Sequence, residues 1–203
     1  SISLEDGVLN DDRMMLLSEA IRHAPALQSI SLDGLRLTDD NMKLLSEAIR
    51  HAPALKCISL RCPWGLKAKD IELLSEAIRH APALQSISLE NFGLTDDRIK
   101  LLSEAIRHAP ALKCISLRCG DLTGDRMKLL SEAIRYAPAL QSISLYCSHA
   151  SGRLTDDVLQ LLSQAIRHAQ ALQSISLESL SMDCGGLTDD RMKLTLKSSL
   201  TMV

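Results

Sequence analysis

Charged side chains at one repeated position are the residues of this chain best suited to recognising another molecule. One residue follows each Ile-Ser-Leu triplet, and in chain order these are Glu5, Asp33, Arg61, Glu90, Arg118, Tyr146 and Glu178. The charge alternates in sign from Asp33 to Arg118. Opposite charges on adjacent strands attract each other. Two interpretations stay open: these residues pair with one another across a sheet, or they form a mixed-charge surface that a partner recognises.

Aromatic residues lie close to this charged column. The chain has one Trp, two Tyr and one Phe. Three of them, Trp64, Phe92 and Tyr146, lie in the column or just after it, and His149 follows Tyr146 closely. Aromatic anchors dominate the binding free energy of many interfaces, so we expect these residues to line a rim beside the column. Trp64 can equally be a plug that fills its own loop.

These observations define the predicted partner-binding residues. They are Asp33, Arg61, Trp64, Glu90, Phe92, Arg118, Tyr146, His149 and Glu178.

Residue types that often catalyse reactions or bind metals occur in patterns that indicate structural roles. A histidine recurs at the end of five predicted helices, where its side chain can bond unpaired carbonyls. Histidines one helix apart are poorly placed to share one metal ion. The repeated serine, for example Ser46, has no recurring histidine and acid beside it. The sequence therefore predicts no catalytic residue, no metal site and no cofactor.

The six cysteines follow the duplication of the sequence. Cys57 and Cys62 recur as Cys114 and Cys119 two repeats later, and no CxxC motif is present. Scattered cysteines of this kind are typical of free thiols in an intracellular protein. We therefore predict free thiols and a cytoplasmic location.

Composition restricts the class of partner. Of the 203 residues, 46% are hydrophobic and only 2% aromatic, which predicts an aliphatic core. The net charge is -2 with no basic cluster, which argues against a nucleic-acid partner. The sequence contains no apolar run of about 20 residues, which argues against a membrane partner.

All these side chains must be positioned by one repeated unit. Residues 16–32 (LLSEAIRHAPALQSISL) recur unchanged at 73–89, and the isoleucines of Ile-Ser-Leu follow each other at steps of 28, 28, 29, 28, 28 and 32 residues. A fixed period of this length is typical of a solenoid, because one small unit cannot bury its own apolar face. We predict a single domain over 1–203, with about seven strand-helix repeats, within a longer array.

Each repeat contains signals for one short strand and one helix. Ile30 and Leu32 alternate with polar residues as a strand requires, Thr38 is a helix N-cap, and Pro53 stops the helix. Glu47 and Arg50 are expected to pair within their helix. We predict seven short parallel strands on the triplets. Helices are predicted near 11–23, 39–51, 68–80, 96–108, 124–136 and 156–168.

The LxxLxL pattern of residues 27–32, in units of 28 or 29 residues, resembles the leucine-rich repeat family in its ribonuclease-inhibitor-like class. The resemblance implies a right-handed α/β solenoid, shaped as a horseshoe, with a concave parallel sheet and a convex helix layer. Strands about 4.8 Å apart beside helices about 8–10 Å apart give the same curvature. The resemblance also implies a non-enzymatic module that binds a protein partner through the concave face and the loops after the strands.

Two other functions stay open at this stage. A resemblance to the Ran GTPase-activating relatives would imply a regulator of a GTPase, with Arg61, Arg118 or Arg153 near the correct rim. Near-perfect repetition also fits a structural or designed scaffold without a ligand. Finally, the first strand, near residues 2–4, would have one unpaired edge, which predicts possible self-association there.

Overall fold

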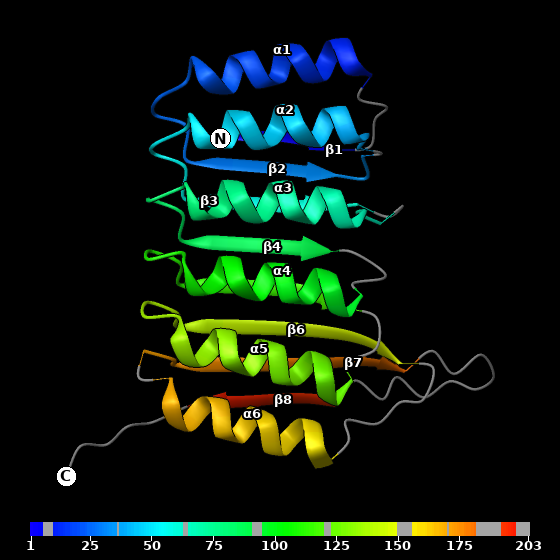
Figure 1. The fold of residues 1–203 in the computed structure, drawn as a ribbon, viewed down its shortest axis with the longest axis vertical. Helices are drawn as coiled ribbons and strands as arrows, with labels where there is room; N and C mark the ends of the chain where they lie inside the picture. Colours follow the sequence, from blue (N-terminus) through cyan, green and yellow to red (C-terminus); the bar gives the residue numbers. More distant parts are fainter. Residues whose placement is uncertain are drawn as a thin grey trace.

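Strands and helices alternate along the described part of the chain. The computed structural model describes residues 1–5, 10–35, 37–62, 65–90, 95–119, 123–149, 156–169, 171–181 and 192–197. Its helices lie side by side in one layer that covers one face of a sheet (Figure 1). The predicted α/β solenoid with a parallel sheet and a separate helix layer is confirmed.

The strands follow one another in the sheet in chain order. They are β1 (Ile2–Glu5), β2 (Ser29–Asp33), β3 (Cys57–Arg61), β4 (Ser86–Glu90), β5 (Cys114–Cys119), β6 (Ser142–His149), β7 (Ser174–Ser181) and β8 (Met192–Lys197). Pairing from β1 to β7 is parallel and places isoleucine beside isoleucine, as Ile30 beside Ile58. The predicted seven parallel strands on the triplets are confirmed.

The helices also lie where the sequence predicts them. They are α1 (Asp11–Arg22), α2 (Asp39–Arg50), α3 (Ala68–Arg79), α4 (Asp96–Arg107), α5 (Gly124–Tyr136) and α6 (Asp156–His168). Thr38 caps α2 as predicted, because its side-chain oxygen accepts a hydrogen bond from Asn41 N at 3.2 Å. At the other end the backbone N–H of His51 donates to the carbonyl of Ala48 at 3.1 Å. That the histidine side chain also meets the carbonyls at the helix end stays a prediction.

The core lies between the sheet and the helix layer. Ile30 and Leu32 of β2 are 0% and 1% exposed, and Met42, Leu45 and Ile49 of α2 are equally buried. The same positions are buried in the neighbouring repeats, so one continuous aliphatic core runs along the stack. None of the helices in the described residues has the length and apolar character that crossing a bilayer requires.

The eighth strand was not predicted. β8 pairs antiparallel with β7, with Ser174 beside Lys197. The expectation of parallel pairing alone was therefore wrong at this edge of the sheet. The reason is visible in the sequence: Met192–Lys197 reads MKLTLK, in which apolar and polar residues alternate with the period of a strand.

Ion pairs connect neighbouring helices in the layer. Arg22 of α1 pairs with Glu47 of α2 at 3.0 Å, and Arg50 of α2 pairs with Glu76 of α3 at 2.9 Å. The expected pair between Glu47 and Arg50 within one helix was wrong, because each arginine reaches the acid of the next helix instead.

Candidate binding surface

The outward residues of the strands form one continuous surface, which we call the strand face. Ile30 and Leu32 of β2 are buried against the helices, so the alternating Ser29, Ser31 and Asp33 lie on the opposite side and are partly exposed. Parallel register aligns each of these three positions across the sheet. The strand face therefore consists of three columns, which pass through Ser29, Ser31 and Asp33.

The column through Asp33 is a chain of ion pairs, which we call the charge ladder. It consists of Asp33, Arg61, Glu90 and Arg118, which lie in register on β2 to β5. Arg61 Nη1 lies 3.4 Å from Asp33 Oδ2, and Arg61 Nε lies 3.4 Å from Glu90 Oε2. Arg118 Nη1 donates to Glu90 Oε2 at 3.2 Å. The interpretation that these residues pair across the sheet is confirmed.

The charge ladder remains accessible although its charges are paired. The side chain of Arg61 is 52% exposed, those of Asp33 and Glu90 are each 37% exposed, and that of Arg118 is 24% exposed. Each ion pair holds two long side chains in one arrangement without removing them from solvent. The ladder thus presents an ordered row of alternating charge.

Other predicted residues extend this row or lie outside the described residues. Tyr146 lies beside Arg118 in register and is partly exposed, and the backbone of Glu178 lies beside Tyr146. Trp64 and Phe92 lie outside the described residues. His149 is the last residue of β6, and its side chain, like that of Glu178, lies outside the described part.

Small side chains fill the other two columns. The middle column contains only serine from β1 to β7, and the first alternates serine with the exposed free cysteines Cys57 and Cys114. Ser174 Oγ donates to Ser142 Oγ at 3.0 Å. The strand face therefore combines a flat area of short serine and cysteine side chains with a row of longer charged side chains.

Two ionisable groups near the charge ladder are buried, Cys62 just after β3 and Asp70 in the first turn of α3. Asp70 is 2% exposed, and its Oδ2 accepts a hydrogen bond from the backbone N–H of Lys67 at 2.7 Å, while Oδ1 has no hydrogen-bond partner among the described residues. Burial raises the pKa of Asp70. Burial, followed by the negative charges of Asp70 and Asp33, raises the pKa of the Cys62 thiol to about 12. A thiol that stays protonated is a poor nucleophile.

The described residues offer no alternative site for metal chemistry. Within the described ranges, no three side chains of His, Cys, Asp or Glu gather closely enough to hold a metal ion. Cys57, Cys62 and Cys114 are free thiols, as predicted for them. The predicted residues that the structure describes thus form a surface of charged and hydrogen-bonding side chains.

Comparison with solved structures recognises the same architecture. The chain is similar to leiomodin-1 actin-binding site 2 (ABS2), with a TM-score of 0.56 and 14% sequence identity over 78% of this chain and 91% of that chain. The fold fits a leucine-rich-repeat-like solenoid. At this identity the likeness shows the fold alone. No protein-family model and no curated protein matches the sequence.

Two features that bear on function were not predicted from the sequence. The burial of Asp70 had one signal, its position three residues after the helix N-cap Lys67. The second is a groove between α5 and α6, whose signal is Gln164 at a position where other helices have glutamate.

Proposed function

We propose that this chain is a non-enzymatic protein-binding module of the ribonuclease-inhibitor-like class, which binds its partner on the strand face and the adjoining strand-to-helix loops. The observation that carries the proposal is the charge ladder: four charged residues, alternating in sign, are ordered by their own ion pairs and yet exposed. Complementary charges on a partner give an interface specificity and a fast association rate.

The surroundings of the ladder support a protein as the ligand. Tyr146 continues the row beyond Arg118 and supplies an aromatic group of the kind that anchors interfaces. Trp64, Phe92 and His149 extend the proposed site to the loop rim. A similar fold occurs in leiomodin-1 actin-binding site 2, which is consistent with a protein-binding role here.

The proposal extends to the organisation of the chain. We propose one solenoid domain over 1–203, within a longer array, in a cytoplasmic protein. Among the described strands β1 pairs with β2 alone, and an unpaired strand edge can bind a second copy of the chain. Arg61 and Arg118 already bind acids of the ladder, which favours a binding module over a GTPase-activating role for them.

A ladder-inversion variant tests the proposal. This variant combines four substitutions: Asp33→Arg, Arg61→Glu, Glu90→Arg and Arg118→Glu. Every neighbouring pair stays attractive and the net charge is unchanged, but the order of positive and negative charges presented to a partner is reversed. Partners are cross-linked to the wild-type chain in a cell lysate and identified by mass spectrometry. The expected result is that one partner is lost both by ladder inversion and by Tyr146→Ala.

The matched control exchanges a charge pair on the helix layer. Arg22→Glu with Glu47→Arg also keeps the net charge and an attractive pair, and it should leave partner capture unchanged. Capture that survives ladder inversion, or that the helix exchange removes equally, would contradict the proposal.

A further inference from the structure

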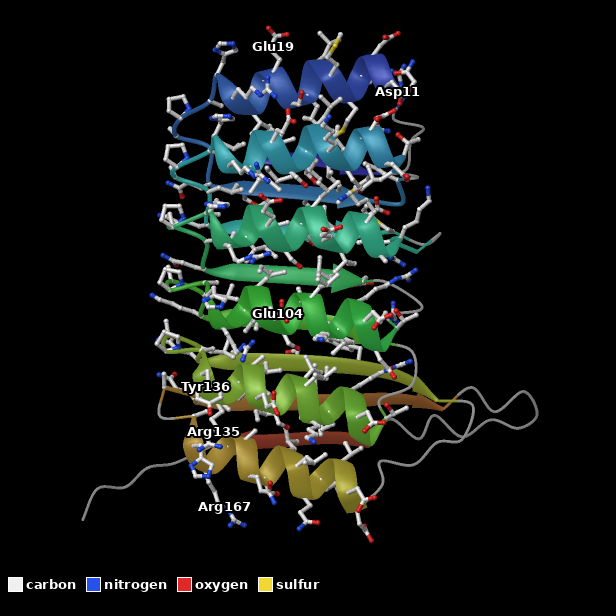
Figure 2. All side chains as sticks on the ribbon, in the orientation of Figure 1. Asp11, Glu19, Glu104, Arg135, Tyr136 and Arg167 are labelled. Atoms are coloured by element: carbon white, nitrogen blue, oxygen red, sulfur yellow. The ribbon has the colours of Figure 1, made fainter. Side chains whose placement is uncertain are left out.

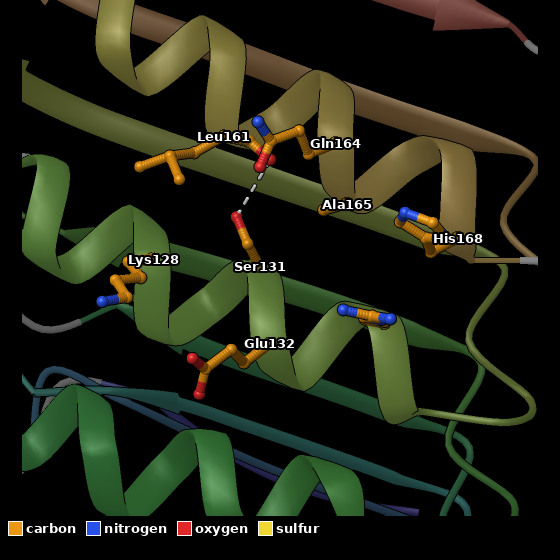
Figure 3. A pocket seen from close by; sticks show the side chains of 8 residues that line it. Lys128, Ser131, Glu132, Leu161, Gln164, Ala165 and His168 are labelled. Carbon is orange, nitrogen blue, oxygen red and sulfur yellow. Dashed lines mark hydrogen bonds between the residues drawn. The ribbon is translucent and has the colours of Figure 1, made fainter.

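The groove between α5 and α6 differs from the equivalent positions elsewhere in the helix layer. It encloses a cavity of about 260 Å³. Lys128 and Ser131 of α5 line one side, and Gln164 and His168 of α6 line the other (Figure 3). Arg135, one turn beyond Ser131 on α5, also lines the cavity.

An acid that the other helices carry is missing from this groove. The position of Gln164 in α6 is glutamate in all five other helices, namely Glu19, Glu47, Glu76, Glu104 and Glu132. At two places this glutamate pairs with the arginine of the preceding helix, at 3.0 Å in α1–α2 and at 2.9 Å in α2–α3. Arg135 is the equivalent arginine of α5 and meets the neutral Gln164. It forms no ion pair with any described residue.

The guanidinium of Arg135 lies over an aromatic ring instead. Its central carbon lies 5.4 Å from the ring centroid of Tyr136, which is itself 57% exposed. The N–H donors of a guanidinium lie in its plane, so stacking on a ring leaves them available. Arg135 and Tyr136 lie together at the end of α5 (Figure 2). The arginine therefore has unused donors at the cavity.

The groove is also more open than its counterparts. The serines equivalent to Ser131 in α2, α3 and α4, which are Ser46, Ser75 and Ser103, are only 1%, 1% and 5% exposed. Ser131 is only half-buried, and its Oγ donates to the carbonyl of Leu161 across the groove at 3.3 Å (Figure 3). A ligand can reach the positions that packing closes in the other repeats.

The charges of the groove select the class of ligand. At the equivalent positions of α2 and α3 the sequence has two basic residues, Lys43 and Arg50, and two acids, Glu47 and Glu76. The cavity between α5 and α6 is lined by two basic residues, Lys128 and Arg135, and by one acid, Glu132. The side chains of Lys128 and Glu132 both point away from α6 (Figure 3). One excess positive charge suits a carboxylate better than a doubly charged phosphate, and arginine binds a carboxylate with two parallel hydrogen bonds. A volume of about 260 Å³ lies below that of most drug-sized pockets and suits one side chain.

We propose that the α5–α6 groove binds an aspartate or glutamate side chain of an acidic segment on a protein partner. Arg135 is the main donor, and the Gln164 amide and His168 are additional donors beside it. This site lies on the helix layer, away from the strand face, so it is independent of the binding surface proposed above.

The test uses a tetraglutamate peptide and the whole chain at low ionic strength. Binding is followed by NMR through the side-chain N–H signals of Arg135 and Gln164, which should shift in a saturable way. Arg135→Ala should weaken binding at least tenfold. Gln164→Glu should do the same, because its carboxylate occupies the donors of Arg135. The second variant should fold normally, since five other helices carry glutamate at this position.

Two controls separate this site from the rest of the surface. Arg50→Ala removes the equivalent arginine of α2 and should leave peptide binding unchanged. The ladder-inversion variant should bind the peptide like wild type, so failure of one site is distinguishable from failure of the other. Three results would overturn the proposal. The first is that tetraglutamate does not bind in a saturable way. The second is that Arg135→Ala or Gln164→Glu binds it with wild-type affinity, and the third is that a phosphoserine peptide binds more tightly than tetraglutamate.

Discussion

Replacing Arg61 should reveal how much the charge ladder stabilises the sheet. Arg61 is the residue of the ladder with acids on both sides, at 3.4 Å from Asp33 and 3.4 Å from Glu90. Coulomb's law gives about 1.2 kcal/mol for unit charges at this distance in water. Because these side chains are more than a third exposed, solvent and side-chain entropy reduce each pair to about 0.5 kcal/mol.

Two variants of Arg61 should therefore differ in the free energy of unfolding. Arg61→Gln loses two attractions and should cost about 1 kcal/mol. Arg61→Glu replaces the attractions with repulsions and should cost about 2 kcal/mol. Inversion of the whole ladder restores alternating charges, so its free energy of unfolding should return to within about 0.5 kcal/mol of wild type.

Urea denaturation followed by circular dichroism measures all three variants. In about 1 M NaCl, where screening acts within about 3 Å, the difference between Arg61→Glu and Arg61→Gln should shrink. Equal stability of these two variants at low salt would refute the reasoning, as would an inverted ladder no more stable than Arg61→Glu alone.

Three further predictions concern the interior and the thiols. Leu89→Ala in the central strand β4 should cost about 2–5 kcal/mol in urea denaturation, because Leu89 is 1% exposed; a cost below 1 kcal/mol would contradict the described packing. The raised pKa of Asp70 means that its contribution to stability is fully present below its ordinary pKa of 3.8 and is lost as pH rises through the raised value. Asp70→Asn should therefore gain stability relative to wild type between acidic and neutral pH, and a pH-independent difference would be evidence against a raised pKa. Iodoacetamide should alkylate Cys57 and Cys114 readily and Cys62 at least about 100-fold more slowly, as read by mass spectrometry of each peptide; equal rates would show that Cys62 is accessible.

The repeats made the elements and the ladder predictable from sequence. Each strand and helix signal occurs several times, so an irregular residue in one copy does not obscure the pattern. Parallel register pairs Ile30 with Ile58, and this alone places Asp33 beside Arg61. The alternation of sign along the column then predicts the ion pairs that the structure contains.

Features that depend on the distance between elements were not predictable in this way. Whether Arg50 pairs with Glu47 or with Glu76 is decided by how closely α2 and α3 pack. Likewise, the sequence shows that Gln164 replaces a glutamate, but whether this leaves a groove beside Arg135 depends on the distance between α5 and α6. The strand β8 was missed for a different reason. The end of the chain was interpreted as part of the last strand-helix repeat, although apolar and polar residues alternate along Met192–Lys197 as in a strand.

Protection of Cys57 and Cys114 by a bound partner tests the central claim most directly. Both thiols are exposed on the strand face, in the column through Ser29, and thus report on this surface without any substitution. The partner identified by cross-linking is added at saturation, and the alkylation rate of each thiol is compared with that of the free chain. Binding on the strand face should slow both thiols at least about tenfold and leave acetylation of Lys43 on the helix layer unchanged. Unchanged thiol rates with protection of Lys43 would place the partner on the helices and contradict the account.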